Sequence, residues 1–456
     1  MRRVVKVSRI RIIITIIVVV LTTLLTGCTG KEPNEIAYVV ALGIDSTDDD
    51  NYKITIQYAN TTQISGGASE SGGKSGSEIV DNVTIEAPNI YAGVGLANNI
   101  VSKSFSMSHA KLIVFSKEIA EKGVKDMIET LVRSEEIRPD VFIAVANTTA
   151  NDYLTSVNPE MEVNPAQYYQ LIYQKNQLVG IPDGQLREFF TGLYTDNYDS
   201  ILPVAGVIEG AGGNSQNDDR EQSKDGQNEG SEGSSESLDS FESKSSDDKD
   251  ENEKEKDAEK NTSKYEYDIK NYVGGETAIE KKNKAEAIGA AVFEKDKMVG
   301  ELGEVETEIC KILKGDYTYS YLTYYNNDTP DIPITVKTTQ QKKPKYKIDT
   351  DKKTVDIELY IESDLYSLPA DYNVENKIED FERDVANYTS SACTEFINNF
   401  TKKYNSDILK LNEKVKYKFL KNNQYNWFKK NVGWSEYKFS VCTNFKVRRT
   451  GLIVRE

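Results

Sequence analysis

The chain has 456 residues, of which 56 are Lys or Arg and 73 are Asp or Glu, so its formal charge is −17. Nucleic-acid binding relies on clustered basic charge, so this excess of acid argues against a nucleic-acid partner. His109 is the single histidine and no CxxC pair occurs, which argues against a His-based metal site, a zinc site or a Ser-His-Asp triad, and we expect no cofactor.

The N-terminal residues 1–27 have the layout of an export signal. Five basic residues and no acid precede an apolar run of about fourteen residues, Ile12 to Leu25. A membrane-spanning helix needs about twenty apolar residues, so this run is too short to favour one. We therefore predict a signal peptide over residues 1–27.

The end of that run is more specific. Leu25-Thr26-Gly27-Cys28 resembles the lipobox of bacterial lipoproteins. The resemblance implies cleavage before Cys28 and a diacylglycerol on its thiol, and two acyl chains anchor a protein stably in a membrane. The alternative is an uncleaved anchor in which Cys28 is incidental. Either way, the rest of the chain lies outside the cytoplasm.

The next segments alternate between strand and helix patterns. Residues 36–45 and 51–60 predict a hairpin, residues 61–80 a Ser/Gly-rich loop, and residues 83–87 a strand. Apolar residues after Pro88 recur at helical spacing, and Gly93-Val94-Gly95 within them lacks the third glycine of a dinucleotide fingerprint.

A strand–helix–strand unit follows. The pattern predicts a buried strand at 111–115, an amphipathic helix at 117–134 and a strand at 140–147, which indicates an α/β unit. Shorter helical segments follow from Asn151 onward, and residues 201–209 close the region as a strand.

Residues 214–263 contain 17 acids and 7 bases and almost no large apolar residues. Such a segment cannot bury enough surface to offset its chain entropy. We predict a disordered linker or loop over 211–263. A cation-binding acidic tract is the alternative.

Three cysteines remain beyond the lipobox, Cys310, Cys393 and Cys442, and we expect them to be small buried apolar residues. Tyr317, Tyr319 and Tyr321 fall on one predicted strand face. A packed sheet face is expected there, the alternative being an aromatic stripe that stacks sugars or bases.

The C-terminal part is the most regular. Residues 346–363 predict a hairpin around Thr350-Asp351, and a single apolar stripe predicts one long helix from Val374 to Ile408. Steps of four residues dominate the stripe, which favours packing on a sheet over a coiled-coil dimer. Residues 444–453 predict a final strand.

Several of these segments together resemble one family. NEIAYVVALGID, SMSHAKLIVFSKEIAEKGVKDMIETLVRSEEIRPDVFIAVANTTANDYL, ILPVAG and, beyond the acidic segment, AIGAAVFEKDKMVGELGEVETEICKILKGD resemble the GerAC (Ger(x)C) spore germination lipoproteins in order and register. In the last of these, Asp296 and Lys297 are expected at a tight turn between two strands. Asp407, Trp427, Trp434 and the final strand resemble the C-terminal domain of the same family.

The resemblance implies the organisation of the chain. It predicts a mixed α+β ectodomain of three domains with mixed sheets and a long C-terminal amphipathic helix packed on a sheet. The expected parts are a signal peptide (1–27), an N-terminal germination-protein domain (28–210), an acidic linker (211–263), a middle domain (264–345) and a C-terminal domain (346–456).

The resemblance also implies a function. It predicts a non-catalytic subunit of a spore nutrient germinant receptor, anchored through Cys28 in the spore inner membrane outside the cytoplasm, with two integral membrane proteins as partner subunits. No catalytic, metal or cofactor-binding residues are transferred. The alternatives are a solute-binding lipoprotein of an importer and a secreted cell-wall hydrolase.

Overall fold

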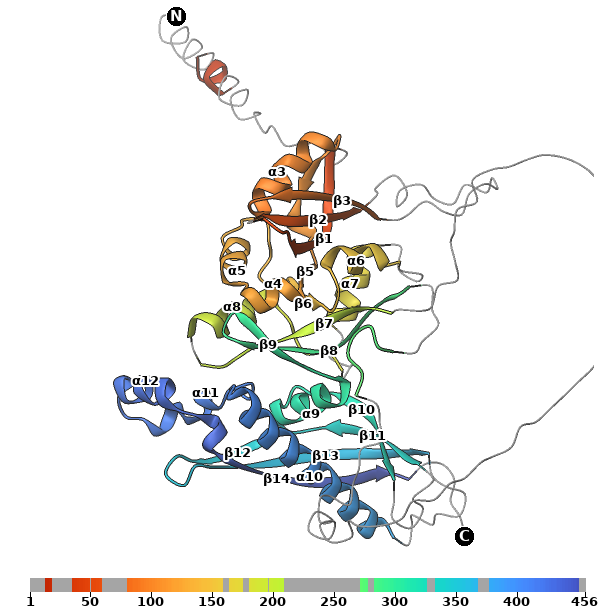
Figure 1. The fold of residues 1–456 in the computed structure, drawn as a ribbon, viewed down its shortest axis with the longest axis vertical. Helices are drawn as coiled ribbons and strands as arrows, with labels where there is room; N and C mark the ends of the chain where they lie inside the picture. Colours follow the sequence, from red (N-terminus) through yellow and green to blue (C-terminus); the bar gives the residue numbers. More distant parts are fainter. Residues whose placement is uncertain are drawn as a thin grey trace, which may run out of the picture. The chain divides into compact units, whose positions relative to one another are not determined.

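The computed structural model (Figure 1) describes residues 13–18, 35–49, 51–59, 80–158, 164–174, 180–195, 197–208, 271–277, 283–325, 333–367 and 377–450. Cys28, most of the predicted 61–80 loop and the whole predicted acidic linker 211–263 lie outside these residues. Residues 13–18, inside the predicted export signal, are helical.

Nine of the described strands form one mixed sheet: β1 (Ile36–Ser46), β2 (Tyr52–Ala59), β3 (Val80–Ala87), β4 (Ser104–Ser106), β5 (Leu112–Ser116), β6 (Phe142–Ala146), β7 (Ile201–Val207), β8 (Ala285–Glu294) and β9 (Lys297–Leu302). Their order is β3-β2-β1-β5-β6-β7-β8-β9, with β4 beside β1. β1, β5, β6 and β7 run parallel, and the strands at both ends of the order pair antiparallel.

Helices cover both faces of this sheet: α3 (Ile90–Ile100), α4 (Lys117–Lys122), α5 (Lys125–Val132), α6 (Ala150–Ser156), α7 (Pro165–Gln174) and α8 (Leu186–Thr195). Successive side chains of a strand point to opposite faces. On β5, Ile113 and Phe115 therefore join the core beneath α3, α4 and α5, whereas Leu112 and Val114 join the core with α6 and α7. Burial on both faces explains why β5 and β6 are apolar at nearly every position.

One predicted helix is divided. The segment 117–134 was expected to be continuous, but it forms α4 and α5, which Gly123 separates with a φ of 124°. A Cβ at this position would lie 2.7 Å from the Asp296 carboxylate, and the next N–H, of Val124, donates to the Asp296 carbonyl at 3.0 Å. The expectation of a continuous helix was wrong because the β8–β9 turn packs directly against Gly123 and leaves no space for a side chain there.

The strand pair expected at the start of the middle domain extends the first sheet. β8 pairs with β7 and β9 with β8, and the turn between them contains Lys295 and Asp296, as the sequence predicts apart from Lys297, which begins β9. Helix α9 (Glu304–Lys314) follows and leads to the second sheet.

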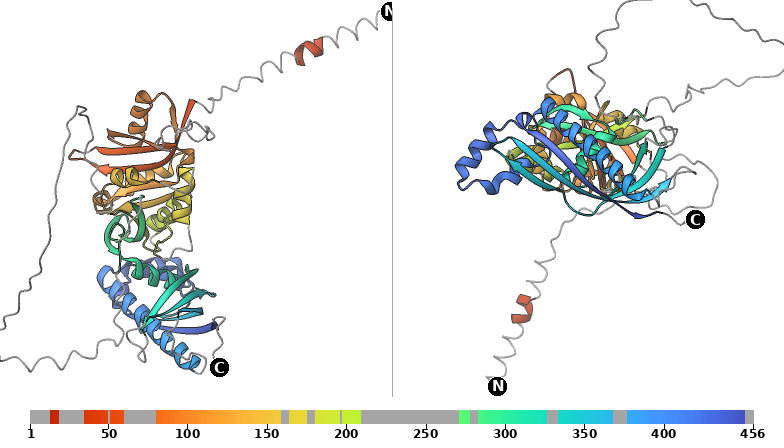
Figure 2. Two further views of the ribbon diagram at one scale, coloured as in Figure 1. Left: turned by 90° about the vertical axis from the view of Figure 1, so that its right-hand side faces the viewer. Right: turned by 90° about the horizontal axis from the view of Figure 1, so that it is seen from below.

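The second sheet consists of β10 (Tyr319–Tyr325), β11 (Pro333–Gln340), β12 (Lys345–Asp349), β13 (Thr354–Ser367) and β14 (Lys438–Arg449). The predicted hairpin is β12–β13. Helix α10 (Ile378–Tyr404) packs on one face of this sheet (Figures 1 and 2). In this interface the rings of Phe381 and Tyr388 lie 6.2 and 5.5 Å from the Tyr324 ring of β10. The mixed α+β class and the packing of the long helix on a sheet are thereby confirmed.

The helix is shorter than predicted. It ends at Tyr404 because Asn405 adopts the left-handed conformation (φ 48°), which is a common helix C-terminus. Ile408, expected within the helix, lies in the following loop. Four short elements then precede β14: α11 (Leu411–Val415), η3 (Lys416–Lys418), α12 (Asn422–Asn431) and η4 (Trp434–Glu436).

Two expectations about single residues were wrong. Tyr317 is buried, but it precedes β10, and Tyr321 is 53% exposed on the outer face of the sheet because Tyr324 fills the face beneath α10. Cys310 and Cys393 are buried as expected, whereas Cys442 is exposed because it occupies an outward position of β14.

Candidate functional site

Two aspartates more than 200 residues apart join the first sheet to the C-terminal helices. Asp199 lies just before β7, and Asp407 lies between α10 and α11. The Asp407 N–H donates to the Asp199 carboxylate at 2.9 Å, and the Asp199 N–H donates to the Asp407 carbonyl at 3.1 Å. This reciprocal pair of hydrogen bonds fixes the two loops against each other.

The Asp407 carboxylate is buried and serves as a helix cap. Its two oxygens accept the N–H groups of Leu411 and Asn412, each at 2.7 Å, at the start of α11. Burial raises the pKa of Asp407 to about 7, and the negative charge of Asp199 adds to this rise, although the two hydrogen bonds and Lys414 oppose it.

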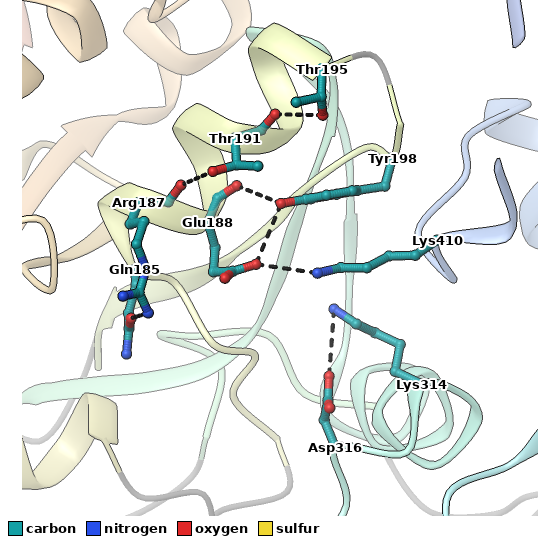
Figure 3. A network of polar contacts seen from close by, with 9 residues as sticks. All are labelled: Gln185, Arg187, Glu188, Thr191, Thr195, Tyr198, Lys314, Asp316 and Lys410. Atoms are coloured by element: carbon teal, nitrogen blue, oxygen red, sulfur yellow. Dashed lines mark hydrogen bonds and ion pairs between the residues drawn. The ribbon is translucent and has the colours of Figure 1, made fainter. Parts of the chain in front are cut away.

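A second contact involves Tyr198 and Lys410, which lie close in sequence to Asp199 and Asp407, and Figure 3 shows it. Lys410 donates to the Glu188 carboxylate of α8 at 3.2 Å, and its ammonium lies 4.2 Å from the centre of the Tyr198 ring. The Tyr198 hydroxyl donates to the Glu188 carbonyl at 2.9 Å. The same hydroxyl also lies 3.4 Å from the Glu188 carboxylate. Burial alone would raise the pKa of Glu188, but the Lys410 charge and the side-chain hydrogen bonds from Lys410 and Tyr198 hold it below its ordinary value.

A cavity of about 690 Å³ adjoins this junction, and its wall includes Asp199, Asp407, Asn412, Lys429 and Trp434. The Lys429 ammonium, in this wall, donates to the Thr195 carbonyl at 2.8 Å. The Asn412 Oδ1 and the Trp434 Nε1 are buried without a hydrogen-bond partner among the described residues. The junction is therefore polar and incompletely paired, unlike the two cores of the first sheet.

Helix α9 contributes a third contact. Lys311 is buried on this helix and donates to the Ile181 carbonyl, in the segment before α8, at 3.1 Å. Burial lowers the pKa of Lys311 and raises that of Glu308, one turn earlier, to about 7. The Lys311 side chain thus ties α9 to the segment around Ile181.

The sequence predicted only part of this site. Asp407 and Trp434 were noted for their family resemblance, and the structure brings both to the junction, whereas Trp427 is exposed. Glu188, Asp199 and Lys410 were missed, because their partners are distant in sequence and no local pattern marks them. Cys28, the predicted lipidation site, lies outside the described residues, and His109 is exposed beside the Tyr38 ring.

These contacts are those of a structural junction, since each carboxylate in it accepts hydrogen bonds from the chain itself. Among the described residues, no three His, Cys, Asp or Glu side chains are placed to hold a metal ion. None of the described helices combines the length and apolar character needed to cross a bilayer.

Comparison with known proteins gives the family. The spore germination protein N-terminal domain matches residues 30–207, and the spore germination B3/GerAC-like C-terminal domain matches residues 288–451. The chain belongs to the GerAC family. Asp199 lies in the first matched region of this GerAC-family protein, and Asp407 lies in the second.

Individual relatives are distant. The protein is 26% identical to spore germination protein KC of Bacillus subtilis (strain 168) over 174 residues, which cover 35% of this chain and 42% of the relative. It is 28% identical to the putative spore germination protein YfkR of the same organism over 145 residues, which cover 32% of this chain and 37% of the relative. The matches thus span about two fifths of the length of these relatives.

Among solved structures, the crystal structure of the GerBC protein resembles the chain with a TM-score of 0.48 and 15% identity, covering 89% of this chain and 96% of that chain.

Proposed function

We propose that this protein is the non-catalytic C subunit of a spore nutrient germinant receptor. The observation that carries the proposal is the match of two GerAC domains, in order, to residues 30–207 and 288–451. The relatives that the chain resembles are themselves named spore germination proteins.

The proposal includes the anchoring and the domain division expected from the sequence. A diacylglycerol on Cys28 would hold the chain on the outer face of the spore inner membrane, with two integral membrane subunits as partners. The ectodomain would comprise residues 28–210, 264–345 and 346–456, with 211–263 as a linker. The lipobox-like Leu25-Thr26-Gly27-Cys28 supports the anchor.

The junction suggests what the subunit does in the receptor. The Asp199–Asp407 and Glu188–Lys410 contacts link a sheet and a helical segment that are far apart in sequence. Suppose that a partner binds the first sheet more tightly in one arrangement of this junction than in another. Its binding would then also shift the equilibrium between arrangements of the C-terminal helices, which is the condition for coupling between two sites. The role proposed is to transmit or stabilise ligand-driven changes of the partner subunits.

The test is a Cys28→Ala chain expressed in spores in place of the natural one. We expect loss of the protein from the inner-membrane fraction and slower germination with nutrient. The matched control is Cys442→Ala, which removes an exposed thiol without touching the lipobox. Unchanged fractionation together with unchanged germination in the Cys28→Ala spores would contradict the proposal.

A further inference from the structure

The short helices after α10 carry a local charge opposite to that of the whole chain. Residues 410–431 contain seven lysines and one acid, a net charge of +6, within a chain of net charge −17. Four of these lysines are exposed: Lys416, Lys418, whose ammonium donates to the Ile348 carbonyl, Lys421 and Lys430. A strongly acidic protein therefore presents a basic segment here.

Three large apolar side chains are exposed in the same segment. Tyr417 is 79% exposed, Leu420 is 98% exposed and Trp427 is 68% exposed. Exposed apolar side chains that gather within a polar surround mark contact sites for proteins or membranes. We call these three side chains and the four exposed lysines the basic–aromatic surface.

The exposure is not caused by a lack of aromatic packing in the segment. The Phe419 ring lies 5.0 Å from the Phe428 ring, and the Phe428 ring lies 6.2 Å from the buried ring of Trp434. Neighbours of the exposed residues thus form a small aromatic core. Tyr417, Leu420 and Trp427 are left outside it.

The position of Leu420 supports this interpretation. Leu420 directly precedes Lys421, the residue before α12, where an apolar side chain commonly folds back on the fourth residue of the helix, here Tyr425. Its nearly complete exposure means that it does not do so. Trp427 lies on the outward side of α12, with the exposed Asn423 one turn before it and the exposed Asn431 one turn after it.

The residue types distinguish a lipid surface from a protein partner. Lysine is depleted in protein–protein interfaces, where arginine is enriched, and residues 410–431 contain no arginine. Lysine together with Trp, Tyr and Leu is the composition of segments that lie in the headgroup region of an anionic membrane. Lysine stems can bury their methylenes there while the ammonium groups meet lipid phosphates.

We propose that the basic–aromatic surface docks on an anionic phospholipid bilayer, with Trp427 and Leu420 entering the headgroup region. This inference rests on the proposed function only in that the latter places the chain at a membrane. Docking would be a second, charge-dependent membrane contact, separate from the lipid on Cys28, and it would limit the orientations that the tethered ectodomain can take.

The fluorescence of Trp427 can report docking directly. The chain has two tryptophans, and Trp434 is only 2% exposed, so changes in tryptophan emission on docking come from Trp427. The full lipidated chain would be mixed with vesicles of phosphatidylcholine alone, or of equal parts phosphatidylcholine and phosphatidylglycerol, each with or without brominated acyl chains. We expect a blue shift and strong quenching of emission by brominated lipid only in the anionic vesicles.

Three variants sharpen the result. Trp427→Phe should remove the quenchable emission. The double variant Lys421→Gln/Lys430→Gln should weaken quenching several-fold. Lys125→Gln/Lys402→Gln, the same charge change at exposed positions of α5 and α10, should leave quenching unchanged.

Sedimentation of the same mixtures separates this inference from the proposed function. Sedimentation of the chain with both kinds of vesicle reports the lipid anchor. A chain that sedimented with neither kind of vesicle would contradict anchoring through Cys28. Quenching of Trp427 reports docking. Equal quenching in neutral and anionic vesicles, absence of quenching in both, or equal effects of the two double-lysine variants would overturn the docking proposal.

Discussion

Asn398 of α10 pairs with the backbone of Phe439 in β14 through two hydrogen bonds. Its Nδ2 donates to the Phe439 carbonyl at 3.0 Å, and its Oδ1 accepts the Phe439 N–H at 3.1 Å. One and two turns earlier, Thr394 and Ser390 accept the N–H groups of Val441 and Thr443 at 3.0 and 2.9 Å. Among the described strands β14 pairs only with β13, so polar side chains of α10 cover its other edge, which would otherwise be open to pairing with another chain.

Replacing Asn398 should therefore destabilise the second sheet. In Asn398→Ala both polar groups of Phe439 lose their partner, and unpaired groups of this kind cost about 1–3 kcal/mol. Urea denaturation of the purified protein measures the change in the free energy of unfolding. Asn399→Ala, at the exposed neighbouring position, is the control and should change it little. Equal losses for the two variants would show that the edge contact contributes nothing specific.

Asp407 should make stability fall as the pH rises toward neutrality. Its pKa is about 7 in the folded chain against an ordinary value of 3.8, so between these values the folded chain holds a proton that the unfolded chain has lost. The free energy of unfolding contributed by this group therefore falls as the pH increases through that range and levels off above about pH 7.

The measurement is the melting temperature from pH 5 to 8 for the natural chain and for Asp407→Asn. The natural chain should lose stability more steeply with rising pH than the variant. Asp126→Asn, at an exposed position of α5, should keep the natural slope. Parallel curves for the natural chain and Asp407→Asn would exclude a raised pKa at this position.

Two glycines should respond oppositely to the same substitution. Gly123→Ala places a Cβ 2.7 Å from the Asp296 carboxylate and keeps a φ of 124°, so we expect a loss of about 1–3 kcal/mol. Gly95→Ala, within α3 and with nothing within 4 Å of the new Cβ, should instead add about 0.5–1 kcal/mol. Thermal or urea unfolding of both variants gives the sign of the change in the free energy of unfolding. A stabilising Gly123→Ala would contradict the explanation given for the break between α4 and α5.

Thiol labelling should separate Cys442 from the two buried cysteines. Burial raises the pKa of Cys310 to about 11 and that of Cys393 to about 12, so near pH 7.5 neither forms the reactive thiolate, and both are also shielded. Maleimide should modify Cys442 in the folded protein and the other two only after unfolding, as read by peptide mass spectrometry. Rapid labelling of Cys393 in the folded protein would mean that the contact between α10 and the sheet opens easily.

The sequence predicted elements better than it predicted their ends. Continuous apolar runs located β1, β5 and β6, and a period-3.6 pattern located α10, because each of these buries a continuous apolar surface. The pattern could not show that Gly123 divides 117–134, since the cause is a turn at Asp296 that lies more than 150 residues away. The Tyr319 and Tyr321 stripe was assigned to the wrong face because periodicity shows that two residues share a face, without showing which face the helix covers.

The sequence by itself determined the family, the mixed α+β class and the long helix on a sheet, since these follow from local patterns and ordered motifs. Only the tertiary structure decided that β8 and β9 complete the first sheet, that Asp199 meets Asp407, and that Asn398 covers the β14 edge. Each of these joins groups distant in the chain, and a hydrogen bond forms only where folding brings its donor and acceptor within about 3 Å. The exposure of Leu420 and Trp427 was likewise decided only by the tertiary structure, because burial is a property of the packed chain.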